Sequence, residues 1–470
     1  MSLLQWLHRL EWPLLLNYLG VILGIVFALI LIPRILRHKH SPAGTLAWIL
    51  AVLLFPYIAA PLYALIGGRK IQSLARRKKP LRFAKTQSET CPTGTHTVDA
   101  LLQTYALPSA ANGHRFFLLT GREERSQTLL ELIDSARQRI DVLMYLFRTD
   151  EIGRQVVEHL IAKSQAGVQV HLLLDKMGSR SAARRFLEPL LQTGGKLAFF
   201  LPQIFRSNLR NHRKMVIVDE KIVMAGGINI GNEYLGWIRR RPIWEDLGFV
   251  FEGPAASDYA EVFRTDWEFA CGEAIPPLRP ESAPAASTET DRSGRVQAVP
   301  SGPDVEGDPL YDIIMTSIFT ARERIWIVTP YFVPDDPLMQ ALRLAAHRCL
   351  DIRILLPEKS DHRLPDWARL PLLRELQAAG AVVHFYSAGM MHAKAFIRDR
   401  DLAVVGSANF DMRSFFLNYE MSLCLYDPEH IRGLETWFLD LIPKTVSKLP
   451  AKRKYDDLFE GFLRMIAPLL

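Results

Sequence analysis

The sequence predicts an α/β protein of two tandem domains related by pseudo-twofold symmetry, preceded by a hairpin of two membrane-spanning helices. Three observations lead to this fold class. Two long stretches near the N-terminus carry no charge, a motif with histidine and lysine occurs twice at identical spacing, and the order of strand-like and helix-like segments repeats between the halves of the 470-residue chain. A chain of this length exceeds one typical domain.

The two uncharged stretches are long enough to cross a membrane. Residues Leu14 to Ile32 contain no charge over 19 positions, and residues Thr45 to Ile66 contain none over 22. About 20 helical residues span a hydrocarbon core. A cleaved signal peptide is the alternative for the first stretch, but no small-residue cleavage site follows it. We expect a transmembrane hairpin over residues 1–70, with Pro56 and Pro61 allowing a kinked or re-entrant second segment.

The distribution of positive charge orients this hairpin. The loop between the stretches holds three Lys and Arg residues, whereas the N-terminal tail and the region after the second stretch together hold nine. Lys and Arg collect on the cytoplasmic side of membrane proteins. We therefore expect a multi-pass protein whose soluble part lies in the cytoplasm.

The net charge of +7 arises close to the membrane segments. Residues 1–90 contain 12 of the 57 Lys and Arg residues against two acidic ones, so the rest of the chain has 45 basic and 48 acidic groups. A nucleic-acid enzyme more often carries its basic excess on the catalytic domain, so no nucleic-acid partner is expected. The basic connector at 71–114 suits anionic lipid headgroups, although its charges could serve only to set the topology.

The doubled motif appears as NHRKMVIVD at residues 211–219 and as MHAKAFIRD at residues 391–399. Histidine, lysine and aspartate recur at identical intervals, a glycine follows each aspartate seven residues later, and an asparagine stands three residues beyond the glycine. Such repetition indicates a duplicated site. Its members are His212, Lys214, Asp219, Gly226 and Asn229, then His392, Lys394, Asp399, Gly406 and Asn409.

The segments around each motif alternate between strand-like and helix-like patterns. Alternation of this kind predicts a mainly parallel sheet covered on both faces. A segment rich in Pro, Ala and Ser at 272–295 is the predicted linker between a first domain at 115–271 and a second at 296–470. The first domain has strand-like segments at 116–121, 139–147, 168–175 and around His212, with helices at 126–138 and 152–165, and the second repeats this order at 296–302, 320–331 and 350–357.

Residues two apart on a strand project from the same face. His212 is therefore expected to point with Lys214, and His392 with Lys394. One such pair alone could be a strand end that emerges into solvent. Two identical pairs in corresponding places indicate a site, and symmetric packing of the domains would bring all four side chains into one pocket.

Two lysines in one pocket can hold a phosphate and stabilise the charge that grows on its oxygens. One histidine can attack phosphorus while the other transfers protons, because the unperturbed pKa of histidine is about 6.5. No metal or other cofactor is expected, since the lysines supply the positive charge. The four cysteines are far apart and lack the spacing of a zinc site.

Further polar residues can support such a site. Asp246 and Glu420 are candidates for carboxylates that orient the histidine rings, although each could be a surface carboxylate beside a strand. Asn229 and Asn409 could donate hydrogen bonds to phosphate or satisfy a tight turn. Asp219 and Asp399 belong to the motif, but their place at strand ends favours a turn or an ion pair over proton transfer.

The pattern H-x-K-x4-D-x6-G-x2-N, present twice, resembles the signature of the phospholipase D superfamily. Together with the two apolar stretches, it makes the chain resemble the bacterial cardiolipin synthases. Three further stretches carry this likeness: SPAGTLAWILAVLLFPYIAAPLYAL, RNHRK and GSANFDMRSFFLNYE. One departure is MMHAK, where Met390 and Met391 stand in place of a small polar residue or leucine before the second histidine.

The resemblance implies two tandem phospholipase D-like domains at a bacterial inner membrane. The implied reaction transfers a phosphatidyl group from one phosphatidylglycerol to another, giving cardiolipin and glycerol through a phosphohistidine. We assign the intermediate to His212 and acid–base work to His392, although the pseudo-symmetry leaves the two interchangeable. The implied site comprises His212, Lys214, Asp219, His392, Lys394 and Asp399 as catalytic residues, Lys214, Lys394, Asn229 and Asn409 around the phosphate, and Asp246 and Glu420 as orienting carboxylates.

Three other functions are compatible with these residues. A membrane-bound phospholipase D would use the same mechanism and release phosphatidic acid, because the choice of acceptor depends on pocket shape and access of water. A membrane-tethered nuclease is disfavoured by the slightly acidic domains. A lipid-binding scaffold without catalysis is disfavoured by the two complete motifs.

Overall fold

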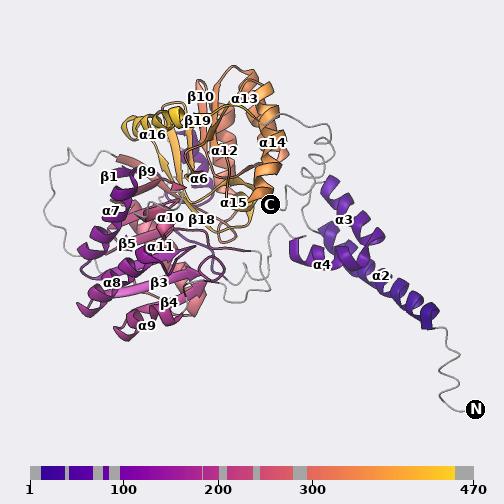
Figure 1. Ribbon diagram of the computed structural model, residues 1–470, viewed down its shortest axis with the longest axis horizontal. Coiled ribbons are helices and arrows are strands. Elements are labelled where there is room, and N and C mark those ends of the chain that lie inside the picture. The colour runs from indigo at the N-terminus through magenta and orange to yellow at the C-terminus, as the bar shows by residue number, and fades with distance from the viewer. Residues whose placement is uncertain are drawn as a thin grey trace, which may run out of the picture. The chain divides into compact units, whose positions relative to one another are not determined.

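The computed structural model describes residues 12–37, 42–66, 78–83, 96–180, 182, 184–200, 209–236, 244–278 and 294–449. The chain forms two compact units (Figure 1). The first comprises residues 1–71 with 206–208, and the second comprises the rest.

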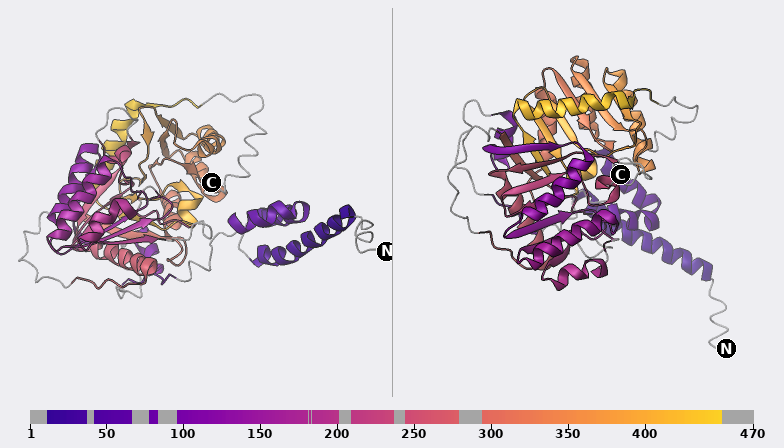
Figure 2. Two further views of the ribbon diagram at one scale, coloured as in Figure 1. Left: turned by 60° about the horizontal axis from the view of Figure 1, so that its bottom comes forward. Right: turned by 60° about the vertical axis from the view of Figure 1, so that its left-hand side comes forward.

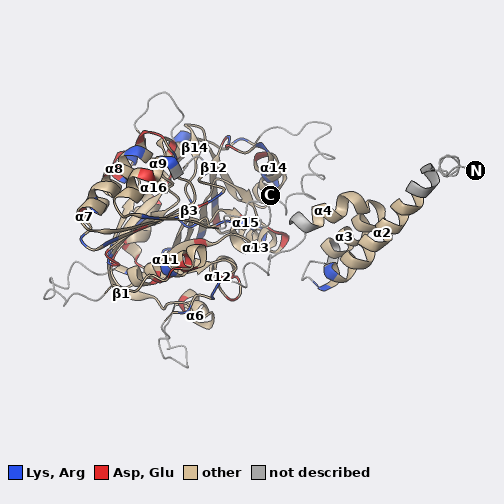
Figure 3. Cartoon of the chain, turned by 90° about the horizontal axis from the view of Figure 1, so that it is seen from below, with Lys and Arg blue, Asp and Glu red and all other residues tan. Residues whose placement is uncertain are grey.

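Three apolar helices make up the described part of the first unit: α2 (Trp12–Arg37), α3 (Pro42–Leu54) and α4 (Pro56–Ile66). Residues 17–37 of α2 form a helix long and apolar enough to cross a membrane. Many large apolar side chains of these helices are exposed, and Figure 3 shows the helices almost without charged residues. Such a surface suits a hydrocarbon environment better than water.

The second apolar stretch is divided between two helices rather than forming one span. The backbone N–H of Phe55 donates to Ala51 O over 2.8 Å, and the next residue is Pro56. Proline has no N–H to donate and disfavours the helical conformation of the residue before it. The expected kink therefore falls at Phe55, whereas Pro61 lies inside α4.

A single sheet of 15 strands runs through both halves of the second unit. Its two central strands pair antiparallel, with Ala111 opposite Val296 and His114 opposite Gly294. From this centre outward the first half contributes β1 (Ala111–Leu119), β8 (Gly248–Glu252), β6 (Ile222–Gly226), β5 (Met215–Val218), β2 (Arg139–Met144), β3 (Gln169–Asp175) and β4 (Lys196–Phe200).

The second half repeats the same order on the other side of the centre, which confirms the tandem repeat. Figure 2 shows the purple first half and the orange to yellow second half side by side. The corresponding strands are β9 (Gly294–Ser301), β18 (Glu420–Leu425), β16 (Leu402–Gly406), β15 (Ala395–Arg398), β10 (Arg324–Val328), β12 (Asp351–Pro357) and β13 (Val382–Tyr386), with β19 (Thr445–Val446) at the outer edge.

The expectation of a mainly parallel sheet is wrong. Within this 15-stranded sheet, the parallel pairs are those among β2, β3 and β4 and those among β10, β12 and β13. The strands from β5 to the centre, and their counterparts in the second half, pair antiparallel. Tight hairpins replace helical crossovers there, with Asp219, Glu220 and Asp399 at positive φ in the turns.

Helices cover both faces of the sheet. One face carries α11 (Ala255–Cys271) and α16 (Pro428–Leu441), whose apolar side chains join one core that extends across both halves. The opposite face has a separate core in each half. Its helices are α7 (Arg122–Ser135), α8 (Glu151–Gln165), α9 (Arg184–Gln192) and α10 (Asn232–Leu235) in the first half, and α12 (Pro309–Thr320), α13 (Asp336–His347), α14 (Arg363–Ala378) and α15 (Met412–Phe416) in the second.

The segment 71–114, expected to be a connector, contributes structure to the second unit. Helix α6 (Thr97–Thr104) buries Val98 and Leu102 in the core that also holds α12 of the second half. Strand β1 begins at Ala111, within this segment. The basic composition of the segment hides these few apolar positions.

Candidate active site

Each histidine motif is anchored to the opposite half of the sheet. The backbone N–H of His212 donates to Tyr419 O over 2.9 Å, and that of His392 donates to Glu245 O over 2.7 Å. In the second case, β14 (Met390–Met391) pairs in parallel with β7 (Trp244–Glu245). The regular strands β5 and β15 begin only after the lysines. The histidines and lysines thus precede the strands, contrary to the expectation that they lie within them.

The two orienting carboxylates are exchanged between the halves. Nδ1 of His212 lies 3.0 Å from both carboxylate oxygens of Glu420. Nδ1 of His392 lies 2.7 Å from Oδ2 of Asp246. Both carboxylates are fully buried. A carboxylate at Nδ1 holds each ring in one orientation and directs Nε2 toward chemistry. At His392, the amine of Lys394 also lies 3.1 Å from Nε2.

The two carboxylates are themselves held differently. Ser407 Oγ and Asn418 Nδ2 both donate to Glu420. At Asp246, the backbone N–H of Leu247 donates to Oδ1 over 2.8 Å. Gly227 occupies the position corresponding to Ser407, where an added Cβ would lie 2.2 Å from Oδ1 of Asp246. Asp246 therefore requires glycine at position 227, whereas Glu420 accepts a hydrogen bond from the serine at the corresponding position 407.

The lysines are buried beside the histidines. Lys214 Nζ donates to His212 O over 2.7 Å, and Lys394 Nζ donates to His392 O. Burial lowers the pKa of Lys214 to about 7, with Glu420 opposing this shift and Lys394 adding to it. Burial likewise lowers the pKa of Lys394 to about 8. An anion placed between these amines would favour their charged forms.

Burial favours the neutral form of both histidine rings. Burial lowers the pKa of His212 to about 4, against the opposing effect of Glu420. Burial and the neighbouring Lys394 lower the pKa of His392 to about 4. Burial alone would raise the pKa of Glu420, but His212 and Lys214 bring it down to about 2. Neutral imidazoles beside ionised carboxylates are suited to nucleophilic attack and proton transfer.

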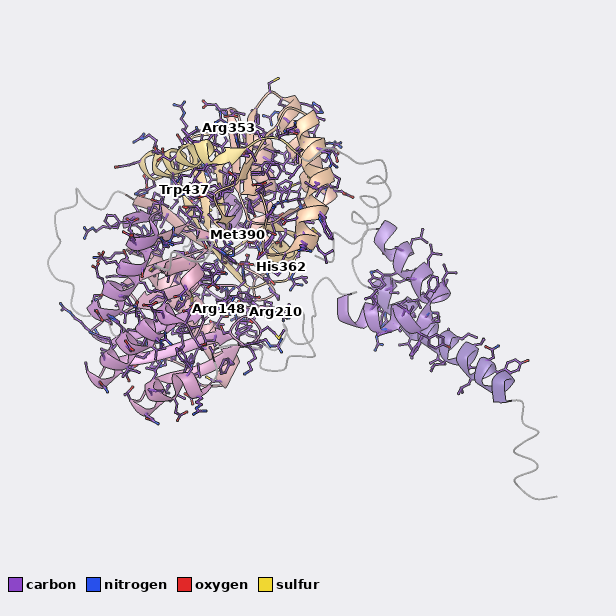
Figure 4. The ribbon with its side chains drawn as sticks, viewed as in Figure 1. Arg148, Arg210, Arg353, His362, Met390 and Trp437 are labelled. Atoms are coloured by element: carbon purple, nitrogen blue, oxygen red, sulfur yellow. The ribbon has the colours of Figure 1, made fainter. Side chains whose placement is uncertain are left out.

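A cavity of about 500 Å³ joins the two half-sites. Figure 4 marks three of its residues, Arg148 and Arg210 from the first half and His362 from the second. It is lined by Tyr145, Leu146, Arg148, Met177, Gly178, Arg210, His212, Asn229, Tyr234, Trp244, Tyr331, Val333, Asp361, His362, Pro365, His392, Asn409, Asp411, Arg413 and Asn418.

Both asparagines of the motif reach this cavity. Asn229 Oδ1 accepts a hydrogen bond from Leu146 N over 3.2 Å. Asn409 Oδ1 is buried and has no hydrogen-bond partner in the described part of the chain. The two side chains are thus placed where an anion between the histidines would meet them.

The aspartates of the motif do not reach the cavity. Asp219 accepts hydrogen bonds from the backbone N–H groups of Arg137, Gln138 and Arg139 over 2.8 to 2.9 Å. Asp399 accepts the corresponding three from residues 322–324. Each stands at the far end of a four-residue strand from its lysine. Their position therefore indicates that they stabilise turns, and it does not favour the catalytic role expected for them.

Sequence reasoning missed the aromatic walls of the site. The ring of Tyr145 lies 4.8 Å from that of His212. The rings of Tyr234 and Trp244 lie 5.2 Å and 5.1 Å from that of His392. Tyr145 ends one of the two matched segments, SARQRIDVLMY, which was a signal of its position. Nothing in the sequence marked the other two rings.

A buried ion cluster lies behind His212. Arg213 contacts Asp266 and Asp304 at 3.0 Å each and donates to Glu420 O over 3.1 Å. Lys78 pairs with the same two aspartates and is 2% exposed. The expectation that the basic connector at 71–114 faces lipid headgroups is therefore wrong for Lys78. The second half has Ala393 in place of Arg213 and cannot form the same cluster.

The described residues include no group of three or more His, Cys, Asp or Glu side chains that could hold a metal ion. The cavity is lined by the side chains of Arg148, Arg210 and Arg413, and the buried amines of Lys214 and Lys394 lie beside its two histidines. The arrangement can hold a tetrahedral anion between two imidazoles, one from each half.

Comparison with known proteins places these features in a family. A family model described as "Cardiolipin synthase, PLD-like domain" matches residues 129–267 and 314–442. A second, described as "Phospholipase_D-nuclease N-terminal", matches residues 25–68. The chain is 33% identical to cardiolipin synthase 1 of Bacillus anthracis over 505 residues, covering 100% of this chain and 97% of that protein.

Two further similarities extend the comparison. The chain is 34% identical to the major cardiolipin synthase ClsA of Bacillus subtilis over 481 residues, covering 96% of this chain and 98% of that protein. A crystal structure of a phosphatidylserine synthase from Haemophilus influenzae has the same fold, with a TM-score of 0.61 at 18% identity, covering 80% of this chain and 98% of that one.

Proposed function

Because this chain belongs to the cardiolipin synthase family, phosphatidyltransferases of the phospholipase D superfamily, we propose that its cavity joins two molecules of phosphatidylglycerol into cardiolipin and glycerol. The observation that carries this proposal is the pair of exchanged contacts, His212 with Glu420 and His392 with Asp246, around one cavity. A site shared by both halves can bind one phosphodiester between a nucleophile and a proton donor.

In the first step, Nε2 of His212 attacks the phosphorus of the donor lipid, because Glu420 occupies Nδ1. The bond between phosphorus and the glycerol oxygen breaks, and His392, which takes up a proton when the anionic lipid binds beside it, donates that proton to the oxygen so that glycerol leaves. Lys214 and Lys394, with Asn229 and Asn409, contact the non-bridging oxygens. The product is a phosphatidyl group bonded to His212.

In the second step, the primary hydroxyl of another phosphatidylglycerol attacks the same phosphorus. His392, now neutral, accepts the proton of that hydroxyl, and the bond between nitrogen and phosphorus breaks. His212 returns to its neutral form and cardiolipin is released. A phosphodiester has been exchanged for a phosphodiester, so no cofactor is required.

The assignment of the nucleophile to His212 rests on the unequal support of the two rings. Phosphorylation makes the ring cationic, and Glu420 faces Nδ1 with both oxygens while Ser407 and Asn418 hold it in place. His392 meets one oxygen of Asp246. The ring with the more firmly held counterion is better suited to carry the intermediate.

The chain is associated with a membrane, as its family and helix α2 indicate. The finer placement is a proposal: a multi-pass hairpin over residues 1–70 in the bacterial inner membrane, with the catalytic domains on the cytoplasmic side. The bias of Lys and Arg toward that side supports it. We also propose domains at 115–271 and 296–470, joined by a linker at 272–295, with their first strands β1 and β9 extending these bounds back to Ala111 and Gly294.

The test is incubation of the purified full-length protein with phosphatidylglycerol labelled in its headgroup, followed by separation of the lipids. Cardiolipin and free glycerol should form, and both should be lost in His212→Ala and His392→Ala. Phosphatidic acid as the sole lipid product would make the protein a hydrolase. Wild-type activity in either variant would remove the histidines from the mechanism.

A further inference from the structure

The catalytic side chains occur in matched pairs, but three arginines that line the same cavity do not. Arg210 stands two residues before His212, where the second half has Met390 before His392. Arg413 stands four residues after Asn409, where the first half has Glu233 after Asn229. Figure 4 labels both Arg210 and Met390.

Arg148 also lacks a basic counterpart. The parallel contacts of Phe147 with Ile230 and of Phe332 with Phe410 align Arg148 with Val333. Its Nε lies 3.0 Å from Glu233, and 45% of its side chain is exposed. Arg148 thus lies at the rim of the cavity, and the other two arginines are the stronger candidates for contact with a bound substrate.

Arg210 and Arg413 come from opposite halves and line the same cavity as His212. Asn418 N donates to Arg413 O over 2.8 Å, and Tyr419 N donates to Arg210 O over 2.9 Å. Burial raises the pKa of Tyr145, whose ring meets that of His212 edge to face, and both guanidinium groups oppose that shift. Burial lowers the pKa of Arg413, with Asp411 opposing and Arg210 adding to the shift. Two like charges held at one end of a cavity favour an anion between them.

Two carboxylates near this pair accept hydrogen bonds from backbone N–H groups. Oδ1 of Asp175 accepts hydrogen bonds from Met177 N and Gly178 N, and its Oδ2 accepts one from Asn211 N. Oδ1 of Asp411 accepts one from Ser414 N. These carboxylates hold the loops of the site through backbone groups.

The proposed reaction brings a second anion to this place. In that reaction the lysines and asparagines of the two motifs bind the transferred phosphate. The accepting phosphatidylglycerol carries its own phosphodiester, separated from the attacking hydroxyl by the three carbons of glycerol, whereas the departing glycerol carries none. We propose that Arg210 and Arg413 form a subsite for the phosphodiester of the acceptor lipid, an inference that rests on the proposed function.

Arginine is suited to this task because its planar guanidinium can bind phosphate oxygens in a bidentate manner. The subsite would favour an acceptor that carries a phosphate over free glycerol or water at the same position. It therefore determines which alcohol resolves the phosphatidyl-enzyme, and it breaks the symmetry of a site that is otherwise duplicated.

Two reactions of the full-length protein in phosphatidylglycerol vesicles separate acceptor binding from donor chemistry. One is formation of cardiolipin. The other is exchange of labelled free glycerol into phosphatidylglycerol, in which glycerol attacks the phosphatidyl-enzyme and no acceptor phosphate is present. In Arg210→Gln and in Arg413→Gln, the ratio of cardiolipin formation to glycerol exchange should fall about tenfold, as expected for loss of one charge-assisted hydrogen bond.

Arg400→Gln is the matched control, because that arginine is 77% exposed in its side chain and lies outside the cavity. Glycerol exchange also reports whether each variant is folded. A ratio that stays at the wild-type value, whether both rates fall together or neither changes, would overturn the subsite. Absence of both reactions in the wild-type protein would instead refute the proposed function, and the inference with it.

Discussion

Glu420 of the second half accepts a hydrogen bond from Nδ1 of His212 in the first half over 3.0 Å, although 208 residues separate them. Asp246 and His392 form the reciprocal contact. Neither half can orient its own histidine, so the two domains make one site rather than two. The exchange explains why a duplicated motif yields a single cavity.

Neutral amides in place of these carboxylates should impair catalysis much more than folding. In Glu420→Gln and Asp246→Asn, the rings lose the anion that fixes their tautomer and stabilises their charged forms. We expect kcat for cardiolipin formation to fall by about 10²- to 10⁴-fold. Glu429→Gln, an exposed residue in the first turn of α16, serves as the control. A loss of kcat no greater than that of the control would contradict the orienting role.

The motif aspartates should behave in the opposite way. Asp219→Ala and Asp399→Ala each remove an acceptor for three backbone N–H groups at a position of positive φ. We expect a decrease of about 2–4 kcal/mol in the free energy of unfolding, with kcat per folded molecule retained. Chemical denaturation and activity in the same detergent measure both quantities. Loss of kcat in a protein of unchanged stability would restore a catalytic role.

Lys78 and its neighbour Lys79 provide a matched pair for the buried ion cluster. Lys78→Met leaves Asp266 and Asp304 with Arg213 as their remaining cation in the cluster, which should cost about 3–5 kcal/mol of stability. Lys79→Met removes an exposed pair with Glu268 and should cost about 0–1 kcal/mol. Denaturation midpoints compare the two variants. Equal effects would mean that Lys78 is no more important to the fold than a surface lysine.

Binding of an anion should take up protons at mildly alkaline pH. The pKa of Lys214 is about 7 and that of Lys394 about 8, both lowered by burial. Both amines therefore lose charge as the pH rises through these values, and a bound phosphate-like anion raises their pKa again. Tungstate binding at about pH 8 should draw protons from the buffer.

Calorimetry in two buffers of different ionisation enthalpy measures this uptake. Lys214→Arg should reduce it, because a guanidinium remains charged throughout this range. Binding heats that are identical in the two buffers for the wild-type protein would show that the lysines are already charged in the free site.

The repeated motif predicted which histidines, lysines and asparagines gather in one place, whereas Asp246 and Glu420 lie outside it and were only candidates for the orienting carboxylates. It could not show that Glu420 serves His212, because the pairing depends on parallel contacts between loops far apart in the chain. The antiparallel pairing of many strands was not predicted, because two short hairpin turns stand where helical crossovers between parallel strands were expected. Lys78 was missed because a buried lysine in a basic run looks the same as its exposed neighbours, and its partners Asp266 and Asp304 lie far away in sequence.

The most direct test of the account is to locate the covalent intermediate. His392→Ala, reacted with a phosphatidyl ester of p-nitrophenol, needs no acid to release its leaving group and lacks the base that resolves the intermediate. Peptide mass spectrometry after an alkaline quench should find the phosphatidyl group on His212. An unlabelled His392→Ala protein, together with a label on His392 in the His212→Ala protein, would contradict the assignment.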